Sequence, residues 1–261
     1  MKYNNLFSLK NKTIVIAGGA GQIGFEIVKG CVAAGANVII ADFDSDMASN
    51  KLNESKTKNV KIHKLDVTNK DSIKKFKKSI TVKIDGLINC FHFKGNSRKL
   101  DTNSSFFSDF SNYPIEAWDE VHNVNLRGAF LLSQSLIPLF NNDASIINFS
   151  STYGIVSPDK SIYGDSGINS PVAYATSKSA IINLTRYMAN HIEGIRVNTL
   201  SPGGVYNNQD EEFVSAYSKK TSLGRMSKAN EYVGPCIFLL CKASSYMTGS
   251  NLIVDGGWTS K

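Results

Sequence analysis

Tyr174 and Lys178 are the side chains whose spacing most clearly suggests chemistry. They lie four residues apart at the start of a strong helix pattern, which places both on one face of that helix, one turn apart. A free tyrosine titrates at about pH 10. A neighbouring ammonium favours the phenolate and lowers the pKa of the hydroxyl toward a range that is useful in acid–base catalysis. Tyrosine and lysine at this spacing are also common as a surface pair, so the pair alone does not predict a site.

Two further polar positions make the pattern more specific. Ser151 follows the predicted strand Ser145–Ser150 and brings a hydroxyl to its carboxyl end, with Ser150 as the competing candidate. Asn125 is an amide in an otherwise apolar part of the preceding predicted helix. Open α/β sheets bind ligands beyond the carboxyl ends of their strands. We therefore expect these residues to meet Tyr174 and Lys178 at one edge of a sheet.

A glycine-rich turn follows the first predicted strand, with the sequence AGGAGQIG at residues 17–24. Glycine is needed where the backbone must come close to a pyrophosphate, because a Cβ would block the approach. The amino terminus of the following helix offers unpaired N–H groups and a positive dipole end to phosphates. Gly24 lets that helix pack tightly on the strand. Any sharp strand-to-helix turn can use glycine, but a turn after the first strand favours a dinucleotide.

Asp42 ends the second predicted strand, 24 residues after Gly18. A carboxylate there accepts hydrogen bonds from the adenosine ribose hydroxyls of NAD and repels the additional phosphate of NADP. No arginine or lysine follows directly, so NAD is predicted over NADP; the alternative is a solvated aspartate in a turn. Asp66 and Val67, after the third predicted strand, are expected to contact the adenine, although Asp66 also fits a helix cap.

Short β-branched apolar runs alternate along the chain with longer helix-period stretches. The strands are nearly continuous apolar runs, as expected for a parallel sheet covered on both faces. The sequence therefore predicts an α/β fold, a single doubly wound Rossmann-type domain over residues 1–261 with a seven-stranded parallel sheet and helices on both faces. The predicted strands are Thr13–Ala17, Asn37–Asp42, Val60–Leu65, Gly86–Phe91, Ser145–Ser150, Ile195–Leu200 and Asn251–Val254, and the predicted helices are Gln22–Ala34, Asp71–Ile80, Ile115–Phe140, Val172–His191 and Ala229–Cys241.

Composition excludes several classes of protein. Hydrophobic residues make up 42% of the 261 residues, with 20 Gly and 6 Pro, which excludes disordered and collagen-like chains. No apolar run approaches the roughly 20 residues that span a bilayer, and the amino terminus lacks a secretory signal. The four cysteines have no CxxC or metal-ligand spacing, and the four histidines lie far apart. We expect a cytoplasmic protein without a metal site.

The formal charge of +7 raises the question of an anionic partner. Much of it comes from lysines around the predicted helix Asp71–Ile80, where Ile73, Phe76 and Ile80 share one face and leave the lysines toward water. A nucleic-acid binder is expected to add aromatic or arginine contacts to bases, and the chain has five scattered arginines. The sequence therefore predicts neither a nucleic-acid nor a membrane partner.

Taken together, these motifs resemble the short-chain dehydrogenase/reductase family over nearly the whole chain, from Lys12 to Trp258. The resemblance also rests on motifs in the family's order: DGLIN at residues 85–89, RVN at 196–198, SPG at 201–203, TG at 248–249 and VDGG at 254–257. It implies that Tyr174 is the general acid/base, that Lys178 lowers its pKa and binds the nicotinamide ribose, that Ser151 orients the substrate oxygen and that Asn125 holds a relay water. The cofactor-binding residues implied are Gly18, Gly21, Gln22, Ile23, Gly24, Asp42, Asp66, Val67, Asn89, Tyr174, Lys178, Pro202, Gly203, Val205 and Asn207.

The chain also departs from the family pattern. Gln22 stands where the family has its middle glycine, and Asn89-Cys90-Phe91-His92 replaces Asn-Asn-Ala-Gly. Asn207 takes the place of a threonine that meets the nicotinamide amide. Two inserted loops, at about residues 94–114 and 152–171, are long for such connections and are expected to frame the substrate mouth.

The substrate is the least determined part of the sequence-based prediction. Lys94, Arg98, Tyr163 and Asn208 are candidate substrate residues, and the basic ones suit an anionic group. The Gly/Pro-rich insertion and the amides at 207–209 resemble oxidoreductases of bacterial surface-glycan and flagellin modification, which favours a sugar or sugar-phosphate alcohol or ketone. A non-sugar alcohol and a non-catalytic nucleotide-sensing scaffold are the alternatives. The family resemblance also implies a homodimer or homotetramer.

Overall fold

Seven parallel strands form one sheet at the centre of the computed structural model, which describes residues 5–95, 105–164 and 170–261. The strand order is β3-β2-β1-β4-β5-β6-β7, so the chain reverses direction across the sheet between β1 and β4. The strands are β1 Thr13–Ala17, β2 Asn37–Asp42, β3 Val60–Lys64, β4 Ile84–Asn89, β5 Phe140–Phe149, β6 Ile195–Pro202 and β7 Asn251–Val254. The predicted fold class is confirmed.

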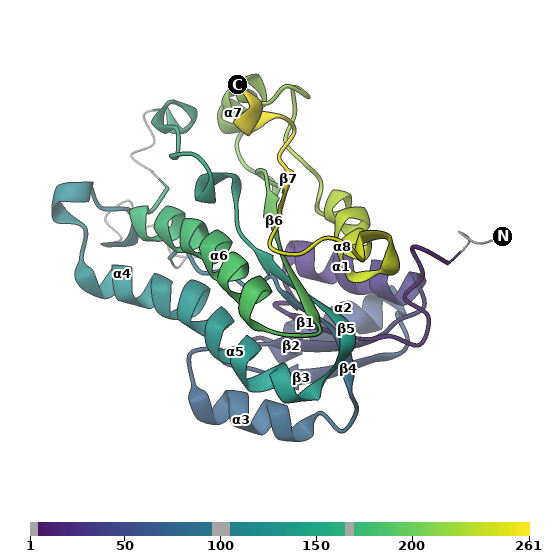
Figure 1. Ribbon diagram of the computed structural model, residues 1–261. Coiled ribbons are helices and arrows are strands. Elements are labelled where there is room, and N and C mark those ends of the chain that lie inside the picture. The colour runs from purple at the N-terminus through teal and green to yellow at the C-terminus, as the bar shows by residue number, and fades with distance from the viewer. Residues whose placement is uncertain (1–4, 96–104, 165–169) are drawn as a thin grey trace.

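Helices cover both faces of this sheet (Figure 1). They are α1 Gln22–Ala33, α2 Ser45–Ser55, α3 Lys70–Ser79, α4 Ile115–His122, α5 Ala129–Leu136, α6 Val172–His191, α7 Glu211–Lys220 and α8 Val233–Leu240. One apolar core joins α1, α2 and α8 to the sheet, and a second joins α3, α5 and α6 to its other face. Both faces are buried, which explains why the strands are continuous apolar runs.

The helix α3 follows the predicted division between a buried and a solvated face. Ile73, Phe76 and Ile80 are at most 7% exposed, while Lys74, Lys75 and Lys78 are exposed. Asn69 caps the helix by accepting hydrogen bonds from the N–H groups of residues 71 and 72. The lysines therefore cover a solvated helix, as predicted.

Two helices escape the sequence-based prediction, and one predicted helix is divided. The unpredicted helices α2 and α7 begin at Asp44 and Asp210, whose side chains accept backbone hydrogen bonds as N-caps. Both bury few residues, so apolar periodicity is weak there. The predicted helix Ile115–Phe140 contains a π-helical turn, η4 (Asn123–Gly128), between α4 and α5, and its last residue, Phe140, begins β5 instead.

Candidate active site

The turn between β1 and α1 has the geometry that close approach of a phosphate needs. Gly18 has φ +86°, and a Cβ on it would lie 2.5 Å from the backbone N of Phe91. A Cβ on Gly24 would collide with the carbonyl oxygen of Gly18. No side chain caps α1 at Gly21, and its first turn carries no acidic residue. The amino terminus of α1 thus fits an anionic group such as a pyrophosphate.

Asp42 turns its carboxylate toward that glycine turn. Its Oδ2 accepts a hydrogen bond of 2.8 Å from the N–H of Ala20, and its Oδ1 accepts one of 3.0 Å from the N–H of Asp44. Lys51, on α2, donates to the carbonyl oxygen of Ala20 at 2.8 Å. Lys64 lies over the ring of Phe43, with its Nζ 5.9 Å from the centroid. Lys51 and Lys64, nine and 22 residues after Asp42 in the sequence, therefore bring positive charge to the end of β2.

The segment after β4 differs from the small residues that the family has there. The side chain of Asn89 is buried and donates to Asn148 at 2.8 Å and to Ser133 at 3.1 Å, so only its backbone is available to a dinucleotide. Cys90 places its Sγ 3.1 Å from the carbonyl oxygen of Ala17 and thereby contacts the glycine turn. Phe91 packs into the core face that includes α3 and α5. These larger residues are accommodated by packing toward the protein interior.

Asp66 and Val67 lie beyond β3 on the same edge. Asp66 accepts hydrogen bonds of 2.9 Å and 2.7 Å from the N–H and hydroxyl of Thr68, which closes a turn before α3, while the N-cap of that helix is Asn69. Val67 is 9% exposed and packs closely on Gly128. A Cβ on Gly128 would lie 2.7 Å from Cγ2 of Val67. Both residues are tied into the structure, and Asp66 keeps further lone pairs for a ligand.

Ser151 and Tyr174 are joined by a side-chain hydrogen bond. Ser151 follows β5 and accepts a hydrogen bond of 3.2 Å from the N–H of Tyr153, which fixes its hydroxyl. Ser150 donates to the carbonyl oxygen of Lys178 at 2.7 Å inside the core. The two neighbouring serines thus have different roles, and only Ser151 faces Tyr174. Burial raises the pKa of Tyr174 above its ordinary value, and the Ser151 hydrogen bond opposes that rise.

Lys178 is 2% exposed and donates a hydrogen bond of 2.8 Å to the carbonyl oxygen of Phe149. Its Nζ lies 5.8 Å from the centroid of the Tyr174 ring. Burial lowers the pKa of Lys178 to about 8. The expectation that this ammonium lowers the pKa of Tyr174 is not met by this geometry, because Nζ binds a backbone carbonyl and burial of the phenol dominates.

Asn125 lies in the π-helical turn η4, a feature that is frequent at functional sites. Its Oδ1 accepts a hydrogen bond of 2.6 Å from the N–H of Phe93, and its Nδ2 donates to Phe93 O at 2.8 Å and to the Ser177 hydroxyl at 3.0 Å. The amide therefore fastens the segment after β4 to α6. Because the side chain is engaged in this way, a relay water would have to bind the main-chain carbonyl of Asn125.

The segment after β6 crosses toward the glycine turn. Pro202 is buried at the end of β6, and Gly203 donates from its N–H to the carbonyl oxygen of Val254 at 2.9 Å. Val205 forms a bridge with Ser227. Asn207 and Asn208 are exposed, and Asn208 has φ +56°. Gln22 donates from its Nε2 to the carbonyl oxygen of Tyr206 at 2.8 Å, a contact that the sequence did not predict.

The candidate substrate residues do not all fall in the described part of the chain. Arg98 lies outside the described residues. The His92 ring lies edge-on to Tyr174, with centroids 6.2 Å apart. Desolvation, followed by the charges of Lys178 and Lys94, lowers the pKa of His92 to about 3. The one sequence signal for a place of His92 beside the dinucleotide is that it replaces a glycine of the family pattern.

Tyr163 comes from the second inserted segment, in the 3-10 turn η7 (Lys160–Tyr163). A side-chain hydrogen bond joins it to Tyr153, and its proximity raises the pKa of Tyr174 further. Its ring lies 5.5 Å from that of Phe213 on α7. Asp159 forms an ion pair of 2.7 Å with Lys220 at the end of the same helix. The described part of the second insertion is therefore packed against α7 near Tyr174.

Two features that the described residues lack bear on other functions. Within residues 5–95, 105–164 and 170–261, no helix is both long and apolar enough to cross a membrane. In the same part of the chain, no three His, Cys, Asp or Glu side chains gather in a way that could hold a metal ion.

Comparison with known proteins places this arrangement in a family. Residues 18–259 match a family model described as "Enoyl-(Acyl carrier protein) reductase". The chain is 31% identical over 262 residues to post-translational flagellin modification protein A of Campylobacter coli, covering 96% of this chain and 99% of that protein. It is 30% identical over 271 residues to 2-dehydro-3-deoxy-D-gluconate 5-dehydrogenase of Bacillus subtilis, covering 99% and 98%.

A solved structure agrees with these sequence relatives. The short-chain dehydrogenase from Leptospira borgpetersenii, solved with bound NAD+, superposes with a TM-score of 0.83 at 36% identity and covers 98% of this chain and 96% of its own. The family match over most of the chain, the shared fold and the seven-stranded sheet agree. The chain belongs to the short-chain dehydrogenase/reductase family of NAD(P)-dependent oxidoreductases that act on alcohol and ketone groups.

Proposed function

We propose that this chain transfers a hydride between NAD and an alcohol or ketone carbon, with Tyr174 as the general acid/base. The observation that carries the proposal is the Ser151–Tyr174 hydrogen bond, with Lys178 Nζ 5.8 Å from the Tyr174 ring centroid, at the carboxyl edge of the sheet. Nucleotide, tyrosine and serine positions meet at this edge because β1, β4 and β5 are neighbours in the sheet.

Each residue has a distinct task in this proposal. The bound dinucleotide supplies the hydride acceptor for the alcohol, or the hydride donor for the ketone. Tyr174 takes the hydroxyl proton of the alcohol or returns a proton to the ketone oxygen. Ser151 donates a hydrogen bond to that oxygen and stabilises the charge that develops on it. Lys178, already buried and oriented by Phe149, presents its ammonium to the nicotinamide ribose.

NAD is favoured over NADP because Asp42 stands where the adenosine ribose binds in this fold. Its carboxylate is oriented by the N–H groups of Ala20 and Asp44 and accepts further hydrogen bonds from ribose hydroxyls. A phosphate on the ribose would meet this negative charge at short range. The NAD+ bound in the Leptospira structure supports the same preference. Lys51 and Lys64 are the opposing observation, since they bring positive charge to the same region.

The proposed substrate is a sugar or sugar-phosphate alcohol or ketone. Lys94 provides positive charge near His92, whose ring lies edge-on to Tyr174, Tyr163 provides a hydroxyl near Tyr174, and Asn208 adds an exposed amide on the segment after β6. Such groups suit a ligand with several hydroxyls and one anionic group. The names of the Campylobacter and Bacillus relatives, a flagellin modification protein and a deoxygluconate dehydrogenase, support a carbohydrate. A non-sugar alcohol remains the alternative substrate.

The test is turnover by wild type and by Tyr174→Phe, followed as NADH absorbance with a panel of sugars, sugar phosphates, steroids and fatty acyl thioesters. We expect Tyr174→Phe to lower kcat by at least about a hundredfold while NADH still binds, because it lacks only the proton-transferring group. Tyr187→Phe is the matched control, since Tyr187 is an exposed tyrosine on the same helix. Equal turnover by Tyr174→Phe would contradict the catalytic role. Binding of NADH without turnover of any substrate would favour the sensing scaffold.

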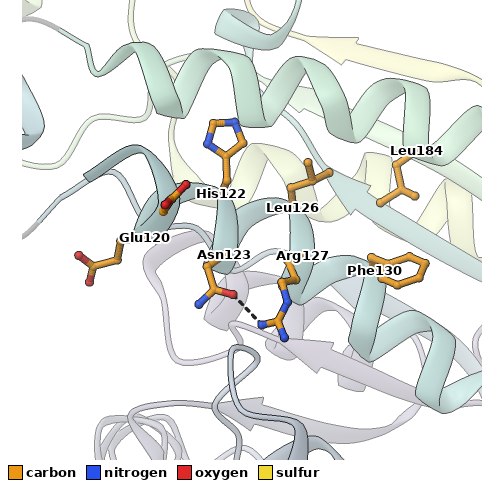
Figure 2. A pocket seen from close by; sticks show the side chains of 8 residues that line it. Glu120, His122, Asn123, Leu126, Arg127, Phe130 and Leu184 are labelled. Carbon is orange, nitrogen blue, oxygen red and sulfur yellow. Dashed lines mark hydrogen bonds between the residues drawn. The ribbon is translucent and has the colours of Figure 1, made fainter. Parts of the chain in front are cut away.

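We also propose a homodimer or homotetramer formed through α4, α5 and α6. A groove of about 820 Å³ opens on this face, between His122, Leu126, Phe130 and Leu184. Figure 2 shows Phe130 and Leu184 beside each other and Arg127 turned to Asn123, with which it forms a hydrogen bond of 2.7 Å. Phe130 is 44% exposed in this groove, so its ring is available to pack against a second copy of the chain. Sedimentation of the purified chain tests this, and a monomer would contradict it.

A further inference from the structure

Gln22 is the departure from the family pattern that the proposed mechanism does not use. It is the first residue of α1 and stands where the glycine pattern has its middle glycine. Its Nε2 donates a hydrogen bond of 2.8 Å to the carbonyl oxygen of Tyr206, 184 residues away. The two segments that this bond connects, the glycine turn and the segment after β6, both belong to the proposed dinucleotide site. The side chain thus bridges the two sides of that site.

The acceptor is held in place by the backbone around it. Tyr206 donates from its N–H to the carbonyl oxygen of Ser227 at 2.9 Å, and Ser227 donates in turn to the carbonyl oxygen of Gly204 at 3.0 Å. The hydroxyl of Tyr217, which is 4% exposed, hydrogen-bonds the N–H of Gly204. Gln209 donates to the carbonyl oxygen of Val205 at 3.0 Å. The carbonyl oxygen of Tyr206 is therefore a positioned acceptor on a braced segment.

We propose that Gln22 retains the dinucleotide by closing the site over the pyrophosphate. The inference rests on the proposed function, since it places the pyrophosphate at the amino terminus of α1. A primary amide has two N–H donors. One is used by Tyr206, and the second is free to donate to a phosphate oxygen beside the first turn of α1. The hydrogen bond to Tyr206 fixes the Gln22 amide between the glycine turn and the segment after β6. The bound pyrophosphate therefore meets a donor that is already oriented.

The expected effect is on the rate at which the dinucleotide leaves. A hydrogen bond to a charged oxygen forms only in the bound state, so its loss raises the dissociation rate more than it changes the association rate. The Gln22 side chain, which connects the glycine turn with the segment after β6, also has to move before the dinucleotide can leave. Gln22→Ala removes the amide, and Gln22→Gly restores the residue that the family pattern has at this position. Both variants change an exposed helix-end residue and are expected to fold.

The experiment measures NADH release by stopped-flow fluorescence, without substrate, together with the equilibrium Kd. We expect Gln22→Ala and Gln22→Gly to release NADH about tenfold faster and to bind it correspondingly more weakly. Tyr206→Phe is the matched control, because it alters the side chain and keeps the carbonyl acceptor; its release rate should equal that of wild type. Melting temperatures of all four proteins verify that each is folded.

Two other results separate this inference from the proposed function. If wild type binds NADH and both Gln22 variants release it within about twofold of the wild-type rate, the retaining role is wrong and the proposed function stands. Slower release by the variants would mean that Gln22 obstructs binding, and also overturns the inference. If wild type binds neither NADH nor NADPH, the proposed function itself fails.

Discussion

The buried part of the candidate active site, here called the floor, and its more exposed part, here called the rim, are built by different means. The floor consists of Asn125, Ser150, Ser151 and Lys178, each at most 9% exposed. All of them hydrogen-bond backbone atoms: Asn125 binds Phe93, Ser150 binds the Lys178 carbonyl, Ser151 binds the Tyr153 N–H and Lys178 binds the Phe149 carbonyl. Phe149 belongs to β5 and Lys178 to α6, so the contacts that involve these two residues cannot change without disturbing the sheet or the helix.

The rim consists of Asp42, Asp159, Tyr163 and Lys220, which are half-buried or exposed. Asp159 and Lys220 bind each other, and Tyr163 packs on Phe213. Contacts between side chains on a surface contribute less and are screened by salt. We therefore propose that the floor sets the chemistry, while the rim selects the ligand and tolerates change. The following predictions test that division, starting with the largest expected effect.

Lys178→Met tests how much the burial of the Lys178 ammonium in the floor contributes to the pH dependence of the unfolding free energy. Burial lowers the pKa of Lys178 to about 8, whereas a lysine in the unfolded chain titrates at about 10.4. Between these values the unfolded state binds more protons than the folded state, so the stability contributed by this group rises with pH. The unfolding free energy of wild type minus that of Lys178→Met should increase by roughly 2 kcal/mol from pH 7 to pH 10.

Urea unfolding at several pH values measures this difference, and Lys178→Leu should give the same slope because it removes the same titration. Tyr174 has a raised pKa, so its own titration lies above this range and works in the opposite direction. A difference that is flat between pH 7 and pH 10 would show that the ammonium in the floor is solvated, which would remove the distinction between floor and rim at this residue.

The floor is also the part that could be predicted from the sequence. Ser151, Tyr174 and Lys178 lie at the ends of elements whose apolar runs mark them clearly, and β1, β2, β7 and α6 have the predicted bounds. The π-helical turn at Asn125 could not be predicted, because its residues continue the helical pattern and only tertiary contacts with Phe93 and Ser177 distinguish it.

The rim was predicted less well because its elements depend on long-range contacts. The helix α7 has an aspartate N-cap, acidic residues in its first turn and lysines in its last, all visible in the sequence. Its packing partners Tyr163 and Trp258 are distant in the chain, so no apolar periodicity revealed it. Lys51 and Lys64 are distant from Asp42 in the sequence, and the fold brings them toward the end of β2. The residues directly after Asp42 therefore did not reveal this positive charge.

Asp42→Ala tests whether the rim selects the dinucleotide. Removing the carboxylate removes the repulsion of the ribose phosphate, and Lys51 and Lys64 then leave net positive charge nearby. We expect the ratio of kcat/KM for NAD over NADP to fall at least about tenfold, which corresponds to about 1.4 kcal/mol. Initial rates with both dinucleotides at several concentrations measure it.

Asp44→Ala provides the matched control for that substitution. Asp44 is a neighbouring carboxylate that accepts a hydrogen bond of 2.8 Å from the N–H of Met47 and caps α2. Its loss should cost about 1 kcal/mol of stability and leave the dinucleotide ratio unchanged. An equal shift of the ratio in both variants would mean that general charge near β2, rather than Asp42 itself, discriminates between the dinucleotides.

Lys220→Ala should have the smallest effect, because the ion pair with Asp159 is partly exposed. The hydrogen bond from Lys220 lowers the pKa of Asp159 to about 2, so the pair stabilises the protein above the ordinary aspartate pKa of about 3.9 and loses this effect as the pH falls toward 2. At pH 7 and low salt we expect a loss of at most about 1 kcal/mol, seen as a melting temperature lower by about 2–4 °C.

Salt distinguishes this ion pair from packing. In 1 M NaCl the Debye length falls to about 3 Å, so the difference between wild type and Lys220→Ala should largely disappear. Lys219→Ala, which changes the adjacent exposed lysine on α7, should show little difference at either salt concentration. A loss of several kcal/mol that persists in salt would mean that the second inserted segment is a structural part of the fold. The rim would then be as firmly built as the floor, and its residues would be poor candidates for tuning the substrate.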